Sequence, residues 1–458
     1  MAIATVNPTT GITERSFEPH SPEHVERALA RAEDAVSALR STDFSTRAAW
    51  MIRSAEILES EVEAVAVLLT TEMGKTLRSA RAEVQKCAKN MRFYAEHAES
   101  FLADEPLADP STVGASSAFA RYEPLGVVLA VMPWNYPLWQ VIRFAAPALM
   151  AGNVGVLKHA SNVPQSALYL DTLFTRGGFP AGAFSTLLID ASAVAAVIAD
   201  PRVKAVTLTG SEPAGRSVAR TAGESIKKAV LELGGSDPFV VMPSADIDAA
   251  AAVATTSRTG NSGQSCIAAK RFIVHADVFD EFVAAFSERM RALRVGDPLL
   301  DSTDVGPLAT RSGRDELAEL VDDAVAHGAT AVVGGTTPDG PGWFYPPTVL
   351  TGITGSMRLH QEEAFGPVAS VYRVSSASEA IALANGTRFG LSSAVWSADP
   401  AEQDRFSREL DAGAVFINGM TVSYPELPFG GIKDSGYGRE LAAAGIREFC
   451  NLKTIWKA

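Results

Sequence analysis

The sequence lacks most of the features that mark specialised classes of protein. Its 458 residues include only three cysteines, Cys87, Cys266 and Cys450, too few and too scattered for a disulfide framework or a cysteine-bound metal. Lys and Arg form no run longer than Lys227-Lys228 and the net charge is −13, so no nucleic-acid partner is expected. No apolar stretch approaches the roughly 20 residues that span a bilayer. The N-terminal segment MAIATVNPTTG lacks the basic start and apolar core of a signal peptide. These absences predict a soluble, cytoplasmic protein without a bound metal or a membrane partner.

The chain is long enough for two or three structural units, and its first hundred residues are predicted to be helical. Hydrophobic residues make up 47% and charged residues 20%, a balance typical of globular proteins. Ser21-Pro22 has the form of a helix cap followed by a first-turn proline, and Val25 and Leu29 continue at helical spacing. We therefore expect helices within residues 21–105.

From about residue 126 the pattern changes to short apolar runs separated by helix-like stretches. The runs of the first set are 126–132, 154–158, 184–189, 205–209 and 229–233. Strands and helices that alternate in this way predict an α/β fold built on a parallel, doubly wound sheet. A second α/β set follows at 271–276, 330–335, 367–373, 392–397 and 414–419. Two further segments, 116–124 and 450–456, alternate like edge strands and could pair with each other or with another subunit.

The sharpest local feature is the segment GNSGQSC, which ends at Cys266. Glycines and small polar residues leave the sulfur accessible and place backbone N–H groups near it. Both effects favour a reactive thiolate because they lower the pKa of a thiol. A cysteine buried in a turn is the commoner explanation of such a residue, and it is the one we adopt for Cys87 and Cys450.

Three other residues lie where open α/β sheets place their sites. Glu232 ends an apolar run and is followed by Gly234-Gly235, and partial burial there would raise its pKa toward that of a general base. Asn135 follows the run 126–132 at the start of a helix, where its amide could donate a hydrogen bond to an oxyanion. Arg143 lies eight residues later on roughly the same helical face. Spacing alone does not distinguish a functional arginine there from a surface ion pair.

A glycine-containing segment, Gly210–Gly215, follows the run 205–209 and opens a helix, so it is a candidate anion site. It is similar to the G-x-x-x-x-G-K loop of nucleotide hydrolases, but Arg216 replaces the lysine and Pro213 removes an N–H donor. A nucleotide hydrolase therefore stays a distant alternative. No G-x-G-x-x-G follows a predicted strand, and the pattern alone indicates only a dinucleotide or phosphate site.

Six segments in order resemble the aldehyde dehydrogenase superfamily, and the likeness runs from about residue 5 to the end. They are PWNYP (133–137), LTGS (208–211), LELGG (231–235), GNSGQSC (260–266), EEAFGP (362–367) and PFGGIKDSGYGRE (428–440). Each is weak alone, but six in family order are specific. The resemblance implies a variant Rossmann cofactor domain, an α/β catalytic domain and a β-strand oligomerisation flap. The cofactor domain would comprise residues 1–110 and 130–233, and the catalytic domain residues 234–445. Residues 111–129 and 446–458 would form the flap, which would build dimers or tetramers.

The resemblance also implies an order of chemical events. Cys266 would attack the aldehyde carbonyl, and the Asn135 amide and the Cys266 N–H would stabilise the oxyanion. Hydride transfer to nicotinamide would leave a thioester on Cys266. Glu232 would activate the water that hydrolyses it to a carboxylic acid.

A set of residues matches the family's dinucleotide contacts. These are Trp134, Lys158, Ser161, Gly210, Ser211, Gly234, Glu363 and Phe365. Many NAD-using members carry a glutamate where this sequence has Ser161, three residues after Lys158. A carboxylate would repel a 2′-phosphate, whereas a hydroxyl beside a lysine would accept one. We therefore predict that NADP is preferred and that NAD can also be used.

Within the superfamily the closest likeness is to bacterial succinate-semialdehyde dehydrogenases. Arg143 matches the arginine that clamps the distal carboxylate, Ser423 matches a hydroxyl often found in the site, and Trp139 could wall the tunnel. A second arginine found in some members is replaced by Gly260. A site with one arginine could be looser and admit glutarate semialdehyde or uncharged aldehydes.

Three alternatives remain beside a semialdehyde dehydrogenase. One is a broad-range enzyme for neutral aldehydes in which Arg143 faces elsewhere. Another is a protein that kept the scaffold but lost catalysis, which the intact set of Cys266, Glu232 and Asn135 disfavours. The last is a CoA-acylating relative, which typically lacks the glutamate at position 232.

Overall fold

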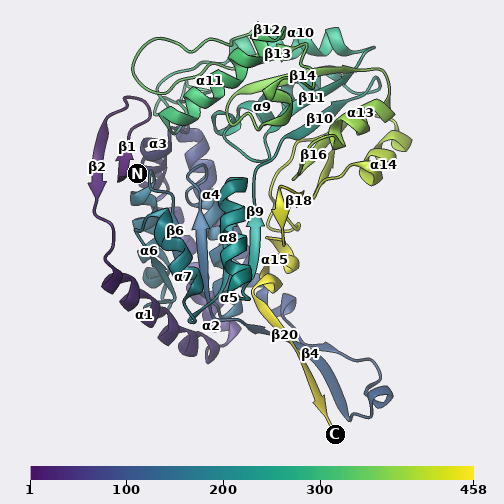
Figure 1. Ribbon diagram of the computed structural model, residues 1–458. Coiled ribbons are helices and arrows are strands. Elements are labelled where there is room, and N and C mark those ends of the chain that lie inside the picture. The colour runs from purple at the N-terminus through teal and green to yellow at the C-terminus, as the bar shows by residue number, and fades with distance from the viewer. Residues whose placement is uncertain (1) are drawn as a thin grey trace.

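The computed structural model describes residues 2–458, and its elements form two large sheets with a smaller third sheet that projects from them (Figure 1). Four helices open the chain: α1 (Pro22–Arg40), α2 (Phe44–Ser60), α3 (Val62–Met73) and α4 (Leu77–Phe101). Ser21 caps α1 by accepting a hydrogen bond from the His24 N–H, with Pro22 in the first turn. The prediction of helices within 21–105 is confirmed. The hairpin β1 (Ile3–Val6) and β2 (Thr13–Phe17) precedes them and was not predicted.

The first large sheet has the strand order β19-β9-β8-β5-β6-β7. Its strands are β5 (Val127–Met132), β6 (Val154–His159), β7 (Phe184–Thr186), β8 (Val203–Thr209), β9 (Lys228–Glu232) and β19 (Gly436–Tyr437). The helices of this unit are α5 (Trp139–Ala151), α6 (Pro164–Gly177), α7 (Val194–Ala199) and α8 (Glu212–Glu224). Strands β5 to β9 are parallel and β19 is antiparallel to β9. The predicted parallel sheet is confirmed, and β5 and β6 are almost wholly buried because helices cover both faces.

The second large sheet has the order β12-β13-β14-β11-β10-β16-β17. Its strands are β10 (Asp237–Val241), β11 (Ala269–His275), β12 (Thr330–Val333), β13 (Thr348–Thr351), β14 (Val368–Val374), β16 (Ser393–Trp396) and β17 (Val415–Ile417). Around them lie α9 (Ile247–Thr259), α10 (Phe279–Ala292), α11 (Arg311–Ala326), α12 (Arg358–Gln361), α13 (Ala377–Asn385), α14 (Pro400–Glu409), β15 (Phe389–Gly390) and β18 (Ile432–Lys433). Strands β10 and β13 of this sheet were not predicted, and neither was the short antiparallel pair of β15 and β18.

The third sheet is an arm of three strands that projects from the body and carries the C-terminus (Figure 1). Strand β20 (Cys450–Lys457) pairs antiparallel with β4 (Ser117–Pro124), and β3 (Glu105–Pro106) pairs with the other side of β4. Both predicted edge strands therefore exist, and they pair with each other, which was one of the two predicted pairings. Helix α15 (Ala442–Glu448) precedes β20 and contacts α4 and α5.

The chain crosses from the first sheet to the second between Glu232 and Asp237, so Gly234 and Gly235 lie at the junction of the two sheets. Strand β19 crosses back and adds an edge to the first sheet beside β9. Within residues 2–458 no helix is both long and apolar enough to cross a membrane.

Candidate active site

Cys266 lies in a tight loop between the end of α9 and the start of β11. Asn261, Ser262 and Gly263 have φ values of 57°, 55° and 74°, so three consecutive residues adopt the left-handed conformation. A Cβ at Gly263 would lie 2.3 Å from the carbonyl carbon of Gly366, and only glycine fits there. The motif that contains Cys266 is therefore a turn that passes directly over the EEAFGP segment.

A buried arginine ties the two ends of this loop together. Arg258, on the last turn of α9, donates from Nη2 to the Gly263 carbonyl at 2.6 Å and from Nη1 to the Ala269 carbonyl at 2.9 Å. Its side chain is fully buried. Arg258 was not predicted, although an arginine near the end of a helix made mostly of alanine and threonine was a detectable signal.

A buried lysine holds the segment that carries the nucleophile. Lys270 donates from Nζ to the carbonyls of Ser265 at 2.9 Å and Cys266 at 2.6 Å, and its Nζ lies 3.0 Å from Oε1 of Glu363. This residue links the cysteine loop to the carboxylate that the sequence assigned to the cofactor. Lys270 was also missed, because its position four residues after Cys266 does not indicate that its side chain returns to the Ser265 and Cys266 carbonyls.

The electrostatic prediction for the nucleophile was wrong in direction. Burial raises the pKa of the Cys266 thiol to about 12, although the charges of Lys270 and Arg143 act to lower it. Loss of hydration at the thiol outweighs the nearby positive charge. The resting group is therefore a thiol, and the attacking thiolate requires a base.

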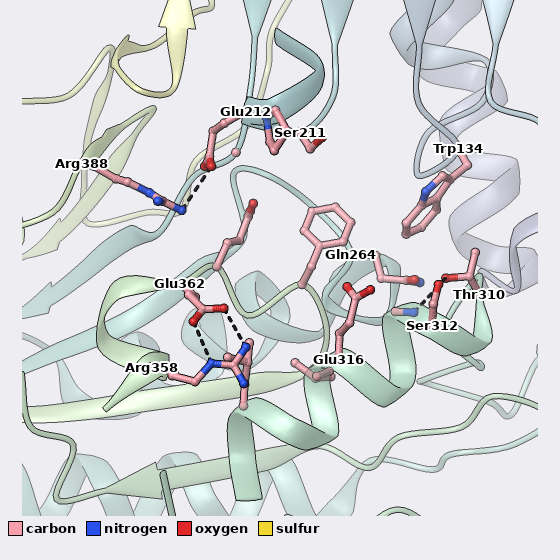
Figure 2. Close-up of a pocket in the computed structure, with 17 residues that line it drawn as sticks. Trp134, Ser211, Glu212, Gln264, Thr310, Ser312, Glu316, Arg358, Glu362 and Arg388 are labelled. Carbon is pink, nitrogen blue, oxygen red and sulfur yellow. Dashed lines mark hydrogen bonds and ion pairs between the residues drawn. The ribbon is translucent and has the colours of Figure 1, made fainter. Parts of the chain in front are cut away.

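A chamber of about 320 Å³ opens beside Cys266, and a larger one of about 590 Å³ adjoins it. The residues that line both are Trp134, Ser211, Gly234, Glu316, Glu363 and Phe365. Figure 2 shows the larger chamber, in which Arg388 points to Glu212 and Arg358 to Glu362. Both arginines are thus neutralised by carboxylates on the protein.

The shape and polarity of these chambers fit a dinucleotide. Ser211 is the N-cap of α8, makes no side-chain capping bond and lines both chambers, so the N-terminus of this helix borders them. A Cβ at Gly234 would lie 2.6 Å from Oε2 of Glu363, and the glycine keeps the wall open there. Trp134 and Phe365 make an edge-to-face contact with ring centroids 5.7 Å apart. Six of the eight predicted cofactor residues line the smaller chamber, namely Trp134, Gly210, Ser211, Gly234, Glu363 and Phe365.

The remaining two predicted cofactor residues lie outside the lining of both chambers. Lys158 is the last residue but one of strand β6, and Ser161 lies in the turn that follows the strand. Both residues are partly exposed. Burial lowers the pKa of Lys158, and the carboxylate of Asp190 opposes this shift. The Ser161 carbonyl accepts a hydrogen bond from the Ala4 N–H at 3.0 Å, which fixes the turn.

Asn135 and the backbone of Cys266 supply donors on the same side of the smaller chamber. The Asn135 amide donates from Nδ2 to the Gln264 carbonyl at 3.1 Å, and Asn135 lines the chamber with Cys266. A primary amide has two N–H groups, and this bond uses one of them. The Cys266 N–H has no acceptor among residues 2–458. Two donors are therefore free for an oxyanion.

Glu232 ends β9 as predicted, but it is more deeply buried than a strand-end glutamate would be. Neither carboxylate oxygen has a hydrogen-bond partner among the described residues, and a Cβ at Gly430 would lie 2.7 Å from Oε1. Burial raises the pKa of Glu232 well above its ordinary value, and the neighbouring Glu440 adds to the rise. Arg143 and Arg439 oppose it. The expected upward shift is confirmed.

Arg143 lies close to the nucleophile but does not face open space. Its guanidinium is 2% exposed and pairs with the carboxylate of Glu440. Nη2 donates to Oγ1 of Thr209 at 3.3 Å, and the guanidinium carbon lies 4.7 Å from the ring centroid of Phe429. Glu440, the last residue of the segment PFGGIKDSGYGRE (428–440), was not identified as a site residue from the sequence. Arg143 lines neither chamber nor the outer pocket described next.

A third pocket, of about 170 Å³, lies on the outer side of the cysteine loop; we call it the outer pocket. It is lined by Lys86, Tyr136, Thr256, Ser257, Gly260, Ser265, Ile267, Ala268, Met420, Thr421, Val422 and Ser423. Ser423 was predicted to contact substrate. Trp139 is buried behind this wall, with Nζ of Lys86 4.2 Å from its ring centroid. Lys86 was not predicted.

Comparisons with known proteins agree with this geometry. The model described as "Aldehyde dehydrogenase family" matches residues 1–455. The chain belongs to the aldehyde dehydrogenase family. The superfamily resemblance is thus confirmed, and so is the α/β fold that it implied.

Several relatives of this aldehyde dehydrogenase carry names that state a substrate. A protein of Mycobacterium avium (strain 104), named an NADP+ succinate-semialdehyde dehydrogenase, is 64% identical over 457 residues, which cover 100% of this chain and 97% of the relative. One from Mycobacterium tuberculosis (strain ATCC 25618 / H37Rv) with the same activity in its name is 62% identical over the full length of both. The crystal structure of the Streptococcus pyogenes succinic semialdehyde dehydrogenase in complex with NADP+ superimposes with a TM-score of 0.96 at 37% identity, over 99% of each chain.

Proposed function

We propose that this aldehyde dehydrogenase oxidises succinate semialdehyde to succinate with NADP+. The observation that carries the proposal is the position of Cys266 between a dinucleotide-shaped chamber and a small outer pocket that contains an ammonium and a hydroxyl group. The names of the full-length relatives support the same substrate and cofactor.

The residues of the site provide each proton and charge that the first step requires. The Cys266 sulfur bonds to the aldehyde carbon, and its proton passes to the Glu232 carboxylate, whose pKa is raised by burial. The carbonyl oxygen becomes an oxyanion. It accepts hydrogen bonds from the second N–H of the Asn135 amide and from the Cys266 N–H.

The second step releases the acid. The first turn of α8, Trp134, Phe365 and Glu363 would hold NADP+, which would accept the hydride as the adduct becomes a thioester on Cys266. Glu232 first releases to solvent the proton that it took from Cys266. It then takes a proton from the attacking water and returns it to the sulfur as the acyl–sulfur bond breaks. The products are succinate, NADPH, two protons released to solvent and the regenerated Cys266 thiol. Hydrolysis, not transfer to another thiol, completes the cycle.

The preference for NADP+ is a proposal that rests on Ser161. This residue follows the end of β6 within three residues of Lys158, and no carboxylate occupies its position. A hydroxyl and an ammonium group both stabilise a 2′-phosphate, and the lack of negative charge removes the repulsion that a glutamate would impose.

One observation favours a second candidate, a broad-range aldehyde dehydrogenase. Because Glu440 already neutralises Arg143, that arginine is not free to select a carboxylated substrate. If no other cation binds the distal carboxylate, neutral aldehydes of similar length will react as well as the semialdehyde. The two candidates share every catalytic residue and differ only in the outer pocket.

Initial rates distinguish them. With NADP+, we expect kcat/KM for succinate semialdehyde to exceed that for butyraldehyde by about 100-fold or more, since a lost charge pair is worth a few kcal/mol. Cys266→Ala should abolish both activities and shows that the measured rate belongs to this site. Equal values of kcat/KM for the two aldehydes would exclude the semialdehyde assignment and leave the broad-range enzyme.

We further propose that the enzyme works as a homo-oligomer in the cytoplasm. The outer edge of β20 is unpaired in the arm, and Leu452 and Trp456 are each about half exposed there, as expected for a surface that another subunit covers. The cysteines of the described chain are all unpaired, which suits a reducing compartment. The functional division that we propose keeps the cofactor unit at 1–110 with 130–233, the catalytic unit at 234–445, and the flap at 111–129 with 446–458.

A further inference from the structure

Lys86 is a cation of the outer pocket that the catalytic steps do not use. It lies on α4 and lines the pocket together with Ser265 and Ile267, the residues that flank Cys266. Nζ donates to Oγ of Ser423 at 2.7 Å and lies 4.2 Å from the ring centroid of Trp139. No carboxylate within residues 2–458 forms an ion pair with it. The Lys86 ammonium therefore contacts the Ser423 hydroxyl and the Trp139 ring, and it is also accessible from the outer pocket.

The contrast with Arg143 shows which of the two cations can receive a substrate anion. Arg143 is sequestered with Glu440 and lines no part of the outer pocket. Separating that pair would leave a buried carboxylate without its counter-charge, which is strongly unfavourable. Lys86 has no such pair to break, and its partner Ser423 can donate its hydroxyl hydrogen to an incoming carboxylate.

We propose that Lys86, together with Ser423, is the specificity-determining group that binds the distal carboxylate of the substrate. This inference rests on the proposed function, because it assigns a carboxylate-binding residue to that same site. It also supplies the cation that the broad-range alternative lacks.

The size and lining of the outer pocket fit a short carboxylated chain between two polar ends. Ser265 and Ile267, the neighbours of Cys266, form the inner end, and Lys86 with Ser423 forms part of the wall. The pocket's volume of about 170 Å³ leaves little room for a long or branched chain. Ile267 and Val422 add apolar surface to the lining, which suits the methylene groups of such a chain.

Charges around Lys86 make its affinity for an anion dependent on pH. Burial and the positive charge of Arg143 on α5 lower the pKa of Lys86 to about 8, and Cys87, Glu83 and Cys266 act in the opposite direction. Below pH 8 the ammonium form predominates and binds a carboxylate. As the pH rises through 8 the free enzyme loses this charge, so kcat/KM for an anionic substrate should fall relative to that for a neutral one.

The test compares two substrates in Lys86→Gln, which keeps a hydrogen-bonding group of similar length but removes the charge. With NADP+, the ratio of kcat/KM for succinate semialdehyde to that for butyraldehyde should fall by about 30-fold or more, mainly through KM for the semialdehyde. Lys86→Arg should restore most of the ratio. The matched control is Lys89→Gln, which removes an exposed lysine that pairs with Glu426 one turn away on the same helix, and it should leave the ratio within about twofold.

A second measurement needs no substitution at all. In the wild-type enzyme the same ratio should fall about tenfold for each pH unit above 8, and in Lys86→Arg it should stay flat to pH 9.5. Using a ratio cancels the ionisation of Cys266 and Glu232, which both substrates share. If wild type discriminates but Lys86→Gln and the pH series leave the ratio unchanged, the inference is overturned and the proposed function survives. If wild type does not discriminate, the proposed function itself fails.

Discussion

Glu232 combines a catalytic task with an unfavourable place in the folded protein. Its carboxylate is buried without a hydrogen-bond donor, and its pKa is raised well above the value of an unfolded chain. An acid with a raised folded pKa destabilises the native state as the pH rises above its unfolded pKa, because the unfolded chain then releases a proton that the folded chain retains. The same burial makes the group an effective base.

Glu232→Gln should therefore separate stability from activity. We expect kcat to fall by about 100-fold to 10,000-fold, with a thioester accumulating on Cys266, because the base for hydrolysis is lost. At the same time Tm at pH 8 should rise above that of wild type, and the gain should shrink toward pH 5. Rapid-quench detection of the acyl-enzyme and thermal unfolding at both pH values test the two halves. An unchanged kcat would remove Glu232 from the mechanism.

Ser161→Glu is expected to change the cofactor rather than the substrate. A carboxylate beside the 2′-phosphate of NADP should lower kcat/KM for NADP+ by about 100-fold, while kcat/KM for NAD+ stays the same or improves. Ser161→Gln is a control of equal size without the charge. A wild-type preference for NAD+ that Ser161→Glu leaves unmoved would show that this turn does not contact the adenosine ribose.

Single residues differ in how far the sequence could identify them. Cys266, Asn135 and Ser423 lie in recognisable segments, and the structure brings each to the surface of the same site. Lys86 and Glu440 could not be found in this way. Lys86 lies in an ordinary amphipathic helix, and the pairing of Glu440 with Arg143 depends on tertiary contacts between segments far apart in the chain.

Among the elements, the turn before Cys266 determines where the sulfur lies. A side chain at Gly263 would meet the Gly366 backbone at 2.3 Å and would also have to adopt φ of +74°. Gly263→Ala should therefore destabilise the protein by about 2 kcal/mol or more, from left-handed strain and overpacking together, and lower kcat by more than tenfold. Gly260→Ala, where nothing lies within 4 Å of the added methyl group, is the control for stability. Equal Tm values for the two variants would contradict the close packing.

The two strands of the second large sheet that were missed, β10 and β13, share a physical cause. Strand β10 begins with Asp237-Pro238, and both residue types are depleted in strands, so its sequence does not indicate a strand although it is central in the second sheet. Strand β13 has four residues and follows a segment rich in proline and glycine. Both strands form because their neighbours provide backbone partners on each side, which is information held by the sheet and not by the segment itself.

For the whole molecule, the arm formed by β20, β4 and β3 is the feature that predicts assembly. Leu452→Glu places a charge on the half-exposed outer strand and should shift the enzyme toward smaller species in light scattering coupled to gel filtration. Leu300→Glu, at an equally exposed leucine outside the arm, is the control. If both variants keep the mass of wild type, the arm is not the subunit interface.

The pairing of β20 with β4 also determines how long β4 waits for its partner strand during synthesis. Glu123 on β4 meets Lys453 on β20, 330 residues later in the chain. A ribosome adds about 5–20 residues per second, so the partner strand reaches β4 only after roughly 15 to 70 seconds. During that interval one edge of β4 has no strand beside it, and chaperones that shield extended segments have their longest opportunity there. Translation errors that stop the nascent chain before residue 450 leave that edge open permanently, so such fragments should be recognised as substrates for degradation.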